Sequence, residues 1–312
     1  MKATVPIKFI LSLVILMLFW GCSNKKKEKN EVNVNIDTTT SQELKFPQDF
    51  PQRRIVYQIP EMKDVICHNG IVYHTVNGID LKADIYVPSN GGKSNTLPIV
   101  IIVINYPDSV FNKIFGRDGK DLQMAVSWAE LIAASGMAAV TYQTQFSHSE
   151  TDSLIYFLKK HAEDYNLDMS NLCVFGASAN TLAAQSLMQN DDYSIKCAVL
   201  NYGILLTPDQ KYYAEIDSSA NMFGFYFSDL RQISKIPENI PMLVTRAGKD
   251  RFQIVKNTTD YFVAEAMRSN AQLTFINYSD GQHDFDVLDD TEISKLIIRQ
   301  TVDFMKTHLL YK

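Results

Sequence analysis

The feature that most constrains the fold is a series of short segments that are apolar along their whole length. A strand with one solvated face alternates apolar and polar residues, whereas a strand covered on both faces does not. The continuous runs therefore predict a mostly parallel central sheet with helices on both faces. They are "PIVIIVIN" (98–105), "MAAVTY" (137–142), "LCVF" (172–175), "CAVLNYG" (197–203), "PMLVTRAG" (241–248) and "QLTFINY" (272–278), and two further strands are predicted before them at 70–76 and 79–87.

The segments between these strands have the periodicity of helices. In residues 151–166, for example, Leu154, Leu158 and Tyr165 fall on one face, as in an amphipathic helix that packs on a sheet. Helices are predicted at 121–135, 151–166, 254–267 and 291–309, and another begins at Ala179. This alternation of strands and helices places the chain in the α/β class. A chain of 312 residues, 46% of them hydrophobic, can bury the core that such a fold needs.

The first residues of the chain have the features of an export signal. Residues 9–20 are apolar except for Ser12, and this run is shorter than the roughly 20 residues that a membrane-spanning helix needs. Gly21 followed by Cys22 resembles the end of a bacterial lipoprotein signal peptide. The resemblance implies that residues 1–21 are removed and that Cys22 carries the lipid. The protein would then be held at a membrane of the bacterial cell envelope, on its periplasmic or surface side. The alternatives are a plain signal peptide and an uncleaved anchor.

A polar segment separates this signal from the rest of the chain. Residues 23–46 are rich in Lys, Asn, Ser and Thr and poor in large apolar side chains. Such a composition does not offset the entropy lost on ordering, so residues 22–50 are predicted to be a flexible tether. The folded domain is predicted to span residues 51–312.

Charge and cysteine content exclude several classes of function. The formal net charge is −5 and no basic stripe is present, so we expect no nucleic-acid partner. After Cys22, three cysteines remain: Cys67, Cys173 and Cys197. Their odd number and irregular spacing favour neither a disulfide framework nor a metal site, and we expect no cofactor. Cys173 and Cys197 lie in apolar runs and are predicted to be buried free thiols.

The stretch "GASAN" (176–180) places Ser178 where a buried strand turns directly into a helix. It resembles the G-x-S-x-G nucleophile elbow of the α/β hydrolases, with Asn180 in place of the second glycine. In that elbow the turn is so sharp that the serine hydroxyl stands clear of the sheet. The small residues around Ser178 suit the close approach of strand and helix that such a turn needs. The alternative is that Ser178 is only a polar residue in a tight turn.

The resemblance also implies two partners for Ser178, because the order along the chain in α/β hydrolases is serine, acid, histidine. His283 lies in the polar loop "SDGQHDFDV", after the last predicted strand. Asp250 directly follows the strand at 241–248. A serine hydroxyl becomes a good nucleophile only when a histidine takes its proton, and a carboxylate holds that histidine in the correct tautomer. Ser178, Asp250 and His283 are therefore the expected catalytic triad.

Other residues compete for these roles. Asp280, Asp284 and Asp286 lie on the same loop as His283, from which they do not easily reach behind its ring. Asp250 has an alternative role as a cap for the following helix. The other downstream histidine, His308, lies in the terminal helix, where we expect it to face solvent or to pack.

The oxyanion site is expected to consist of two backbone N–H groups. One is that of Ala179, which follows the serine. The other normally comes from a loop after an early strand, where some hydrolases have His-Gly-x-Pro and this chain has Ile-Asn-Tyr-Pro at 104–107. Because Pro107 has no N–H, Tyr106 is the expected second donor. The alternative is that this loop is only a turn.

The resemblance to α/β hydrolases spans residues 55–309. The segments "NGIDLKADIYVP" (77–88), "SWAELIAASGMAAVTY" (127–142) and "LDMSNLCVFGASAN" (167–180) are similar to those of esterases and dienelactone-hydrolase-like proteins. Between the strands at 197–203 and 241–248 lies a long aromatic-rich segment, which we expect to form a small cap or a pocket wall. Its aromatic residues are Tyr212, Tyr213, Phe223, Phe225, Tyr226 and Phe227.

These observations favour a membrane-anchored serine hydrolase, with a carboxylic ester as substrate and an acyl-enzyme formed on Ser178. The ester is expected to be a small molecule or a glycan ester. Two alternatives remain: a peptidase of the same fold, and a non-catalytic binding lipoprotein that retains the fold.

Overall fold

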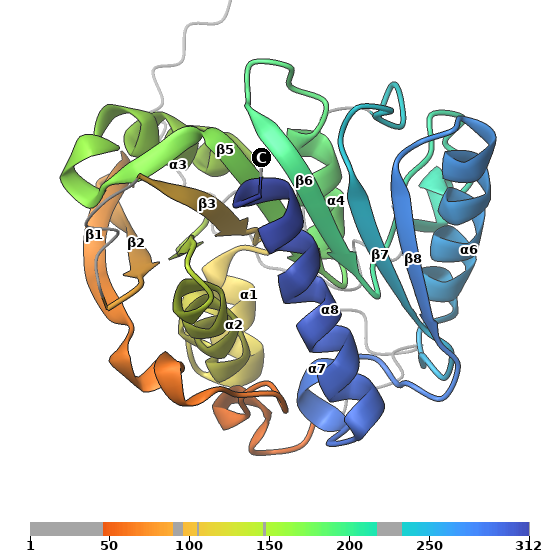
Figure 1. Ribbon diagram of the computed structural model, residues 1–312. Coiled ribbons are helices and arrows are strands. Elements are labelled where there is room, and N and C mark those ends of the chain that lie inside the picture. The colour runs from red at the N-terminus through yellow and green to blue at the C-terminus, as the bar shows by residue number, and fades with distance from the viewer. Residues whose placement is uncertain (1–45, 90–95, 105, 146–147, 217–232, 312) are drawn as a thin grey trace, which may run out of the picture. The chain divides into compact units, whose positions relative to one another are not determined.

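The residues described in the computed structural model are 46–89, 96–104, 106–145, 148–216 and 233–311, and all of them belong to one compact unit, residues 41–312. They form an eight-stranded sheet with the order β1-β2-β4-β3-β5-β6-β7-β8 (Figure 1). The strand β2 runs antiparallel to β1 and β4, and all other neighbours are parallel. The strands are β1 (Ile66–Val76), β2 (Ile79–Val87), β3 (Leu97–Ile102), β4 (Ala138–Tyr142), β5 (Leu167–Ala177), β6 (Ile195–Asn201), β7 (Met242–Ala247) and β8 (Leu273–Tyr278).

The helices confirm the predicted alternation. The α-helices are α1 (Asp108–Phe115), α2 (Gln123–Ala134), α3 (His148–Lys160), α4 (Asn180–Leu187), α6 (Gln253–Arg268), α7 (Phe285–Leu288) and α8 (Glu292–Leu309). Short 3-10 helices are η1 (Phe50–Gln52), η2 (Pro60–Asp64), η3 (Gly119–Asp121) and η4 (Glu163–Tyr165). The sequence predicted α2, α3, α4, α6 and α8. It did not predict α1 and α7, which are too short to carry a readable apolar stripe.

Helices cover both faces of the sheet, which explains why its central strands are apolar throughout. In β3, Ile99 and Ile101 pack with residues of α3, α4 and α6. The alternate residues Val100 and Ile102 face the other side and pack with α2 and α8. Side chains of successive strand residues point to opposite faces, so a strand between two helical layers has no polar face. The predicted parallel sheet between two helical layers is confirmed.

The segment before η1 belongs to this fold, although its sequence was assigned to the tether. Phe50 is 4% exposed. The ring centroids of Phe46 and Phe115 lie 5.0 Å apart, and those of Phe50 and Phe115 lie 5.5 Å apart. Aromatic contacts of this kind bury large apolar surfaces. The packed part of the chain therefore begins by Phe46, rather than at residue 51.

The predicted lipid anchor and most of the predicted cap lie outside the described residues. The anchor residue Cys22 falls in the range 1–45, and the cap residues outside the described ranges are Phe223, Phe225, Tyr226 and Phe227. The described start of the cap segment packs at Tyr212, whose ring centroid lies 5.8 Å from that of Tyr261 on α6. No helix in the described ranges has both the length and the apolar character needed to cross a membrane.

The described cysteines are free thiols. Cys173 and Cys197 are buried, as predicted, and face each other across the pairing of β5 with β6. Cys67 is exposed on β1.

A buried carboxylate connects three elements beneath the loop that carries His283. Asp286, on α7, is 1% exposed. It accepts hydrogen bonds from Trp128 Nε1 on α2 and from the hydroxyl of Tyr202, which follows β6, each at 2.7 Å. Burial raises the pKa of Asp286 to about 6, although the two hydrogen bonds favour its charged form. These contacts fix α7 to the rest of the fold.

We expect Asp286→Asn to change how stability depends on pH. Because the folded state raises the pKa of this group above its ordinary value, the stability of the wild type falls, relative to the variant, as pH rises through about 6. The relative change corresponds to about 3 kcal/mol in the free energy of unfolding. Urea denaturation of both proteins between about pH 4 and pH 7 measures it. Parallel pH profiles would contradict the assignment, and Asp280→Asn, an exposed change, provides the matched control.

Candidate active site

Ser178 lies in a sharp turn between β5 and α4. Its φ is +56°, in the left-handed region that few non-glycine residues adopt. Its N–H donates to the carbonyl of Asn201, at the end of β6, over 3.0 Å. A Cβ added at Gly176 would lie 2.9 Å from Cα of Thr181, so only glycine allows this approach of strand and helix. The local structure is therefore the strained strand–turn–helix that "GASAN" predicted.

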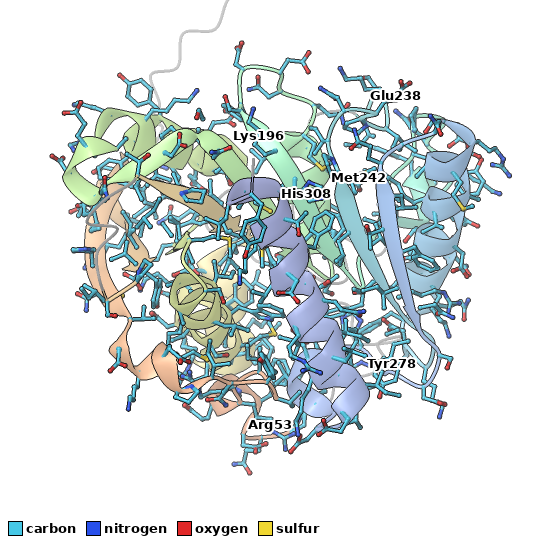
Figure 2. The ribbon with its side chains drawn as sticks, viewed as in Figure 1. Arg53, Lys196, Glu238, Met242, Tyr278 and His308 are labelled. Atoms are coloured by element: carbon cyan, nitrogen blue, oxygen red, sulfur yellow. The ribbon has the colours of Figure 1, made fainter. Side chains whose placement is uncertain are left out.

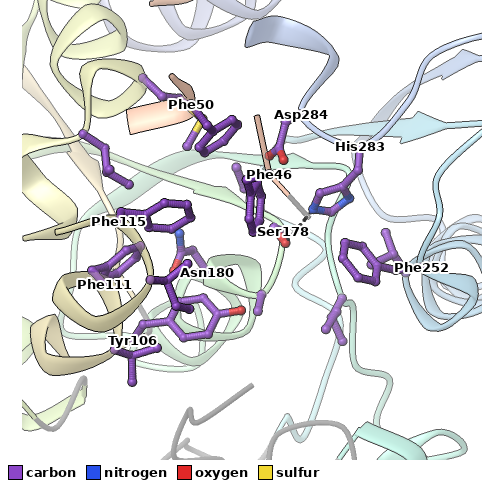
Figure 3. Close-up of a pocket in the computed structure, with 18 of the residues that line it drawn as sticks. Phe46, Phe50, Tyr106, Phe111, Phe115, Ser178, Asn180, Phe252, His283 and Asp284 are labelled. Carbon is purple, nitrogen blue, oxygen red and sulfur yellow. Dashed lines mark hydrogen bonds between the residues drawn. The ribbon is translucent and has the colours of Figure 1, made fainter. Parts of the chain in front are cut away.

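The structure brings together the three residues that the sequence singled out. Nε2 of His283 lies 2.8 Å from Oγ of Ser178, and Nδ1 lies 2.6 Å from Oδ2 of Asp250 (Figure 3). A carboxylate accepts from Nδ1–H, so Nε2 is left to accept the serine proton. Oδ1 of Asp250 also accepts the N–H of Phe252 at 2.8 Å, so this side chain both orders the turn before α6 and holds the imidazole.

The competing groups lie elsewhere. Asp280 is exposed and pairs with Lys249 at 2.7 Å. Asp286 is bonded to Trp128 and Tyr202, as described above. His308 packs against Phe304 on α8 with a centroid distance of 4.6 Å. In Figure 2, His308 lies near Lys196 and Met242, where the strands β6 and β7 begin. Tyr278, where β8 ends, lies on the opposite side of the sheet.

The imidazole of His283 is 5% exposed and enclosed by aromatic rings. Its ring centroid lies 5.1 Å from that of Tyr202 and 4.9 Å from that of Phe252. Burial lowers its pKa, but the negative charge of Asp284 and the hydrogen bond to Asp250 outweigh burial, and the net effect raises the pKa. A more basic imidazole is a stronger proton acceptor once it is neutral.

The site opens into an aromatic pocket of about 120 Å³ (Figure 3). Phe46, Phe50, Phe111 and Phe115 line one part of it, and Phe252 lies on the other side of Ser178. The polar side chains of the lining are those of Ser178, Asn180, His283, Asp284 and the Tyr106 hydroxyl. A mostly apolar cavity with a few polar groups is typical of a site for a small organic ligand. The sequence did not predict the roles of Phe46, Phe50 and Asp284 in this lining.

The two residues expected at the oxyanion site also line the pocket. The N–H of Ala179 precedes α4, where backbone N–H groups have no partner within the helix. Tyr106 packs edge-on against Phe111 with a centroid distance of 5.5 Å, and the neighbouring residue 105 lies outside the described residues. The donor roles of Ala179 and Tyr106 remain predictions.

Asn180, which replaces the second glycine of the motif, begins α4 and lines the same pocket. Its place at the pocket gives room to a side chain that would otherwise crowd the elbow. In the part of the chain that the structure describes, no group of three or more His, Cys, Asp or Glu side chains is arranged to hold a metal ion.

Neither the family models nor the curated protein sequences that were compared with the chain gave a match. Solved structures did. A structure described as a bacterial heroin esterase has 11% identity and a TM-score of 0.57, covering 81% of this chain and 87% of its own. A thermophilic esterase from the planctomycete Thermogutta terrifontis has 15% identity and a TM-score of 0.59, covering 81% and 96%.

A thermostable esterase from Pseudomonas putida is similar at 13% identity, with a TM-score of 0.57 and coverage of 82% of this chain and 86% of its own. At such identities a structural likeness establishes the fold alone. Together with the strand order and the crossover helices, it shows that the chain has the α/β-hydrolase fold.

Proposed function

We propose that this protein is a serine hydrolase that cleaves carboxylic esters. The observation that carries the proposal is the hydrogen-bonded series Ser178–His283–Asp250 at the wall of an aromatic pocket. This arrangement of nucleophile, base and orienting acid is what acyl transfer requires. Solved esterases share the fold, which supports the ester as the substrate class at low sequence identity.

In the proposed acylation, Oγ of Ser178 attacks the ester carbonyl carbon while Nε2 of His283 takes the hydroxyl proton. The carbonyl oxygen becomes an oxyanion, and in this proposal the N–H groups of Ala179 and Tyr106 stabilise it. The tetrahedral intermediate then collapses. The bond to the alcohol oxygen breaks, and the alcohol leaves with the proton from His283.

In the proposed deacylation, a water molecule takes the place of the alcohol. His283 removes a proton from the water, whose oxygen attacks the acyl carbon. The second intermediate collapses, the carboxylic acid leaves, and Oγ of Ser178 recovers its proton from His283. Throughout, the carboxylate of Asp250 holds the imidazole in one tautomer and offsets the charge of the imidazolium.

We also propose that the hydrolase is anchored at a membrane of the cell envelope through a lipid on Cys22. The support is in the sequence: a short apolar run at 9–20, followed by Gly21 and Cys22. Several acyl chains on one cysteine would hold the protein firmly.

Ser178→Ala removes the proposed nucleophile. We expect ester turnover to fall by roughly three orders of magnitude or more, because triad residues act as a unit. Stability should be kept or increased, since the strained backbone at this position serves the reaction. Hydrolysis of a short activated ester and labelling by a fluorophosphonate measure the effect, with Ser170→Ala, an exposed position on the preceding strand β5, as control. Equal rates for wild type and Ser178→Ala would refute the proposed function.

Asp250→Asn should leave the imidazole without its orienting charge and in the wrong tautomer. We expect a loss of roughly a thousandfold or more in kcat, with folding retained. Asp280→Asn, a change of the same type at an exposed ion pair, should retain full turnover. The assignment of the acid would be wrong if Asp250→Asn kept wild-type turnover while Asp280→Asn or Asp286→Asn lost it.

Cys22→Ser tests the anchor. We expect the variant to remain an uncleaved precursor or to move into the soluble fraction, because serine does not accept the lipid. Cell fractionation and mass spectrometry of the N-terminal peptide measure this, and ester turnover by the domain should not change. Wild-type protein found in the soluble fraction with residue 22 unmodified would contradict the proposal.

A further inference from the structure

The side chain of Asp284 is a charged group inside the pocket that the triad does not use. Asp284 follows His283 directly and is 6% exposed. Its φ of +58° gives it a left-handed backbone. In the close-up its carboxylate points into the pocket, between Phe50 and the imidazole (Figure 3). Ser178, His283 and Asp284 line the same pocket, so an ester bound there for attack would share that pocket with the Asp284 side chain.

The backbone carbonyl of Asp284 accepts the N–H groups of Val287 and Leu288, at 2.9 Å each, but its side chain makes no contact of this kind. It precedes α7, but its side chain accepts no capping hydrogen bond from that helix. Within the described residues its carboxylate makes no hydrogen bond or ion pair. Burial raises its pKa, and the positive charges of His283 and Arg251 oppose that shift. By contrast, Asp280 and Asp286 both have direct partners. A mostly buried carboxylate that makes no direct hydrogen bond or ion pair gains free energy when a ligand provides one.

The rest of the pocket lining complements a positive charge. Among the described lining residues are the aromatic side chains of Phe46, Phe50, Tyr106, Phe111, Phe115 and Phe252. No lysine or arginine is found among the lining residues that the structure describes. Arg251, which is exposed, places its guanidinium carbon 5.0 Å from the Phe46 ring centroid and 4.8 Å from that of Phe252. These two rings at the pocket therefore already lie within cation–π distance of one cation.

We propose that the pocket selects esters that carry a positively charged nitrogen, a quaternary ammonium or a protonated amine, and that Asp284 is the residue that recognises it. This inference rests on the proposed esterase function and specifies its substrate class. The cation lies against the aromatic rings while the ester carbonyl meets Ser178. Asp284 is a specificity residue here, and it takes no part in bond making or breaking.

Two physical effects favour a cation over a neutral hydroxyl group as the partner. A buried carboxylate has lost most of its water, so the attraction of an opposite charge is stronger there than at the surface. The faces of aromatic rings also attract cations, and by more when water is excluded. A hydroxyl group would gain only the hydrogen bond to the carboxylate. The cation is therefore the ligand for which carboxylate and rings act together.

The test compares pairs of esters that differ only in charge. Acetylcholine and the isostere in which carbon replaces its nitrogen form one pair. The methyl ester of trimethylammoniobutyrate and its carbon isostere form the second, with the charge on the acyl side. For the wild type we expect kcat/KM to favour the charged member of at least one pair by roughly ten- to thirtyfold. Equal values within both pairs would overturn the proposal.

Variants identify the residue responsible. Asp284→Asn keeps the size of the side chain and tolerates the left-handed backbone. It should reduce the preference for the charged member to about one. The ratio within a pair cancels any general effect on His283. Asp280→Asn, on the same loop, should keep the wild-type preference. A preference that survives in Asp284→Asn would also overturn the proposal.

A binding measurement separates this inference from the proposed function. Tetramethylammonium should raise the Tm of the wild type and of Ser178→Ala, and should leave that of Asp284→Asn unchanged. If the wild type hydrolyses no ester and is not labelled by the fluorophosphonate, the proposed function fails. If it hydrolyses the uncharged isosteres, but tetramethylammonium does not change its Tm, only the cation site fails.

Discussion

The close approach of α4 to the ends of β5 and β6 is the constraint on which the site depends. Glycines at 176 and 203 make room for Thr181: a Cβ at Gly203 would lie 2.3 Å from its side chain. The Thr181 hydroxyl in turn donates to the carbonyls of Ser178 and Ile204, at 2.7 Å each. With the helix this near, the chain turns through a single left-handed residue, and the Ser178 side chain reaches the imidazole.

The order of the strands determines how the other two groups reach that serine. Parallel strands end at one edge of the sheet, so residues that follow β5, β7 and β8 meet there although they are far apart in sequence. The strand β6 lies between β5 and β7, and the residue after it, Tyr202, is fully buried. Its ring packs edge-on against His283 and its hydroxyl bonds to Asp286. The imidazole is thus supported by Tyr202, the residue that follows the intervening strand.

The sequence predicted Ser178, Asp250 and His283 because each lies at or soon after the end of a predicted strand, in the order serine, acid, histidine that the resemblance to α/β hydrolases implies. The same reasoning did not distinguish the roles of the three remaining acids around His283. Asp280, Asp284 and Asp286 share a residue type and a short stretch of chain, but Asp280 is exposed, Asp284 lines the pocket and Asp286 is buried on α7. That difference comes from the left-handed backbone at residue 284 and from tertiary contacts. Neither can be predicted from composition or from the periodicity of apolar residues.

The N-terminal boundary was missed for a related reason: Phe46 and Phe50 are isolated aromatic residues in a polar stretch, and their packing depends on α1, whose apolar pattern is short. Both rings belong to the pocket lining as well as to the fold. The residues that begin the folded domain therefore also form part of the pocket wall. In the proposed hydrolase, Phe46 and Phe50 precede the whole sheet, so a change at either would alter what the pocket binds without touching the residues proposed to react.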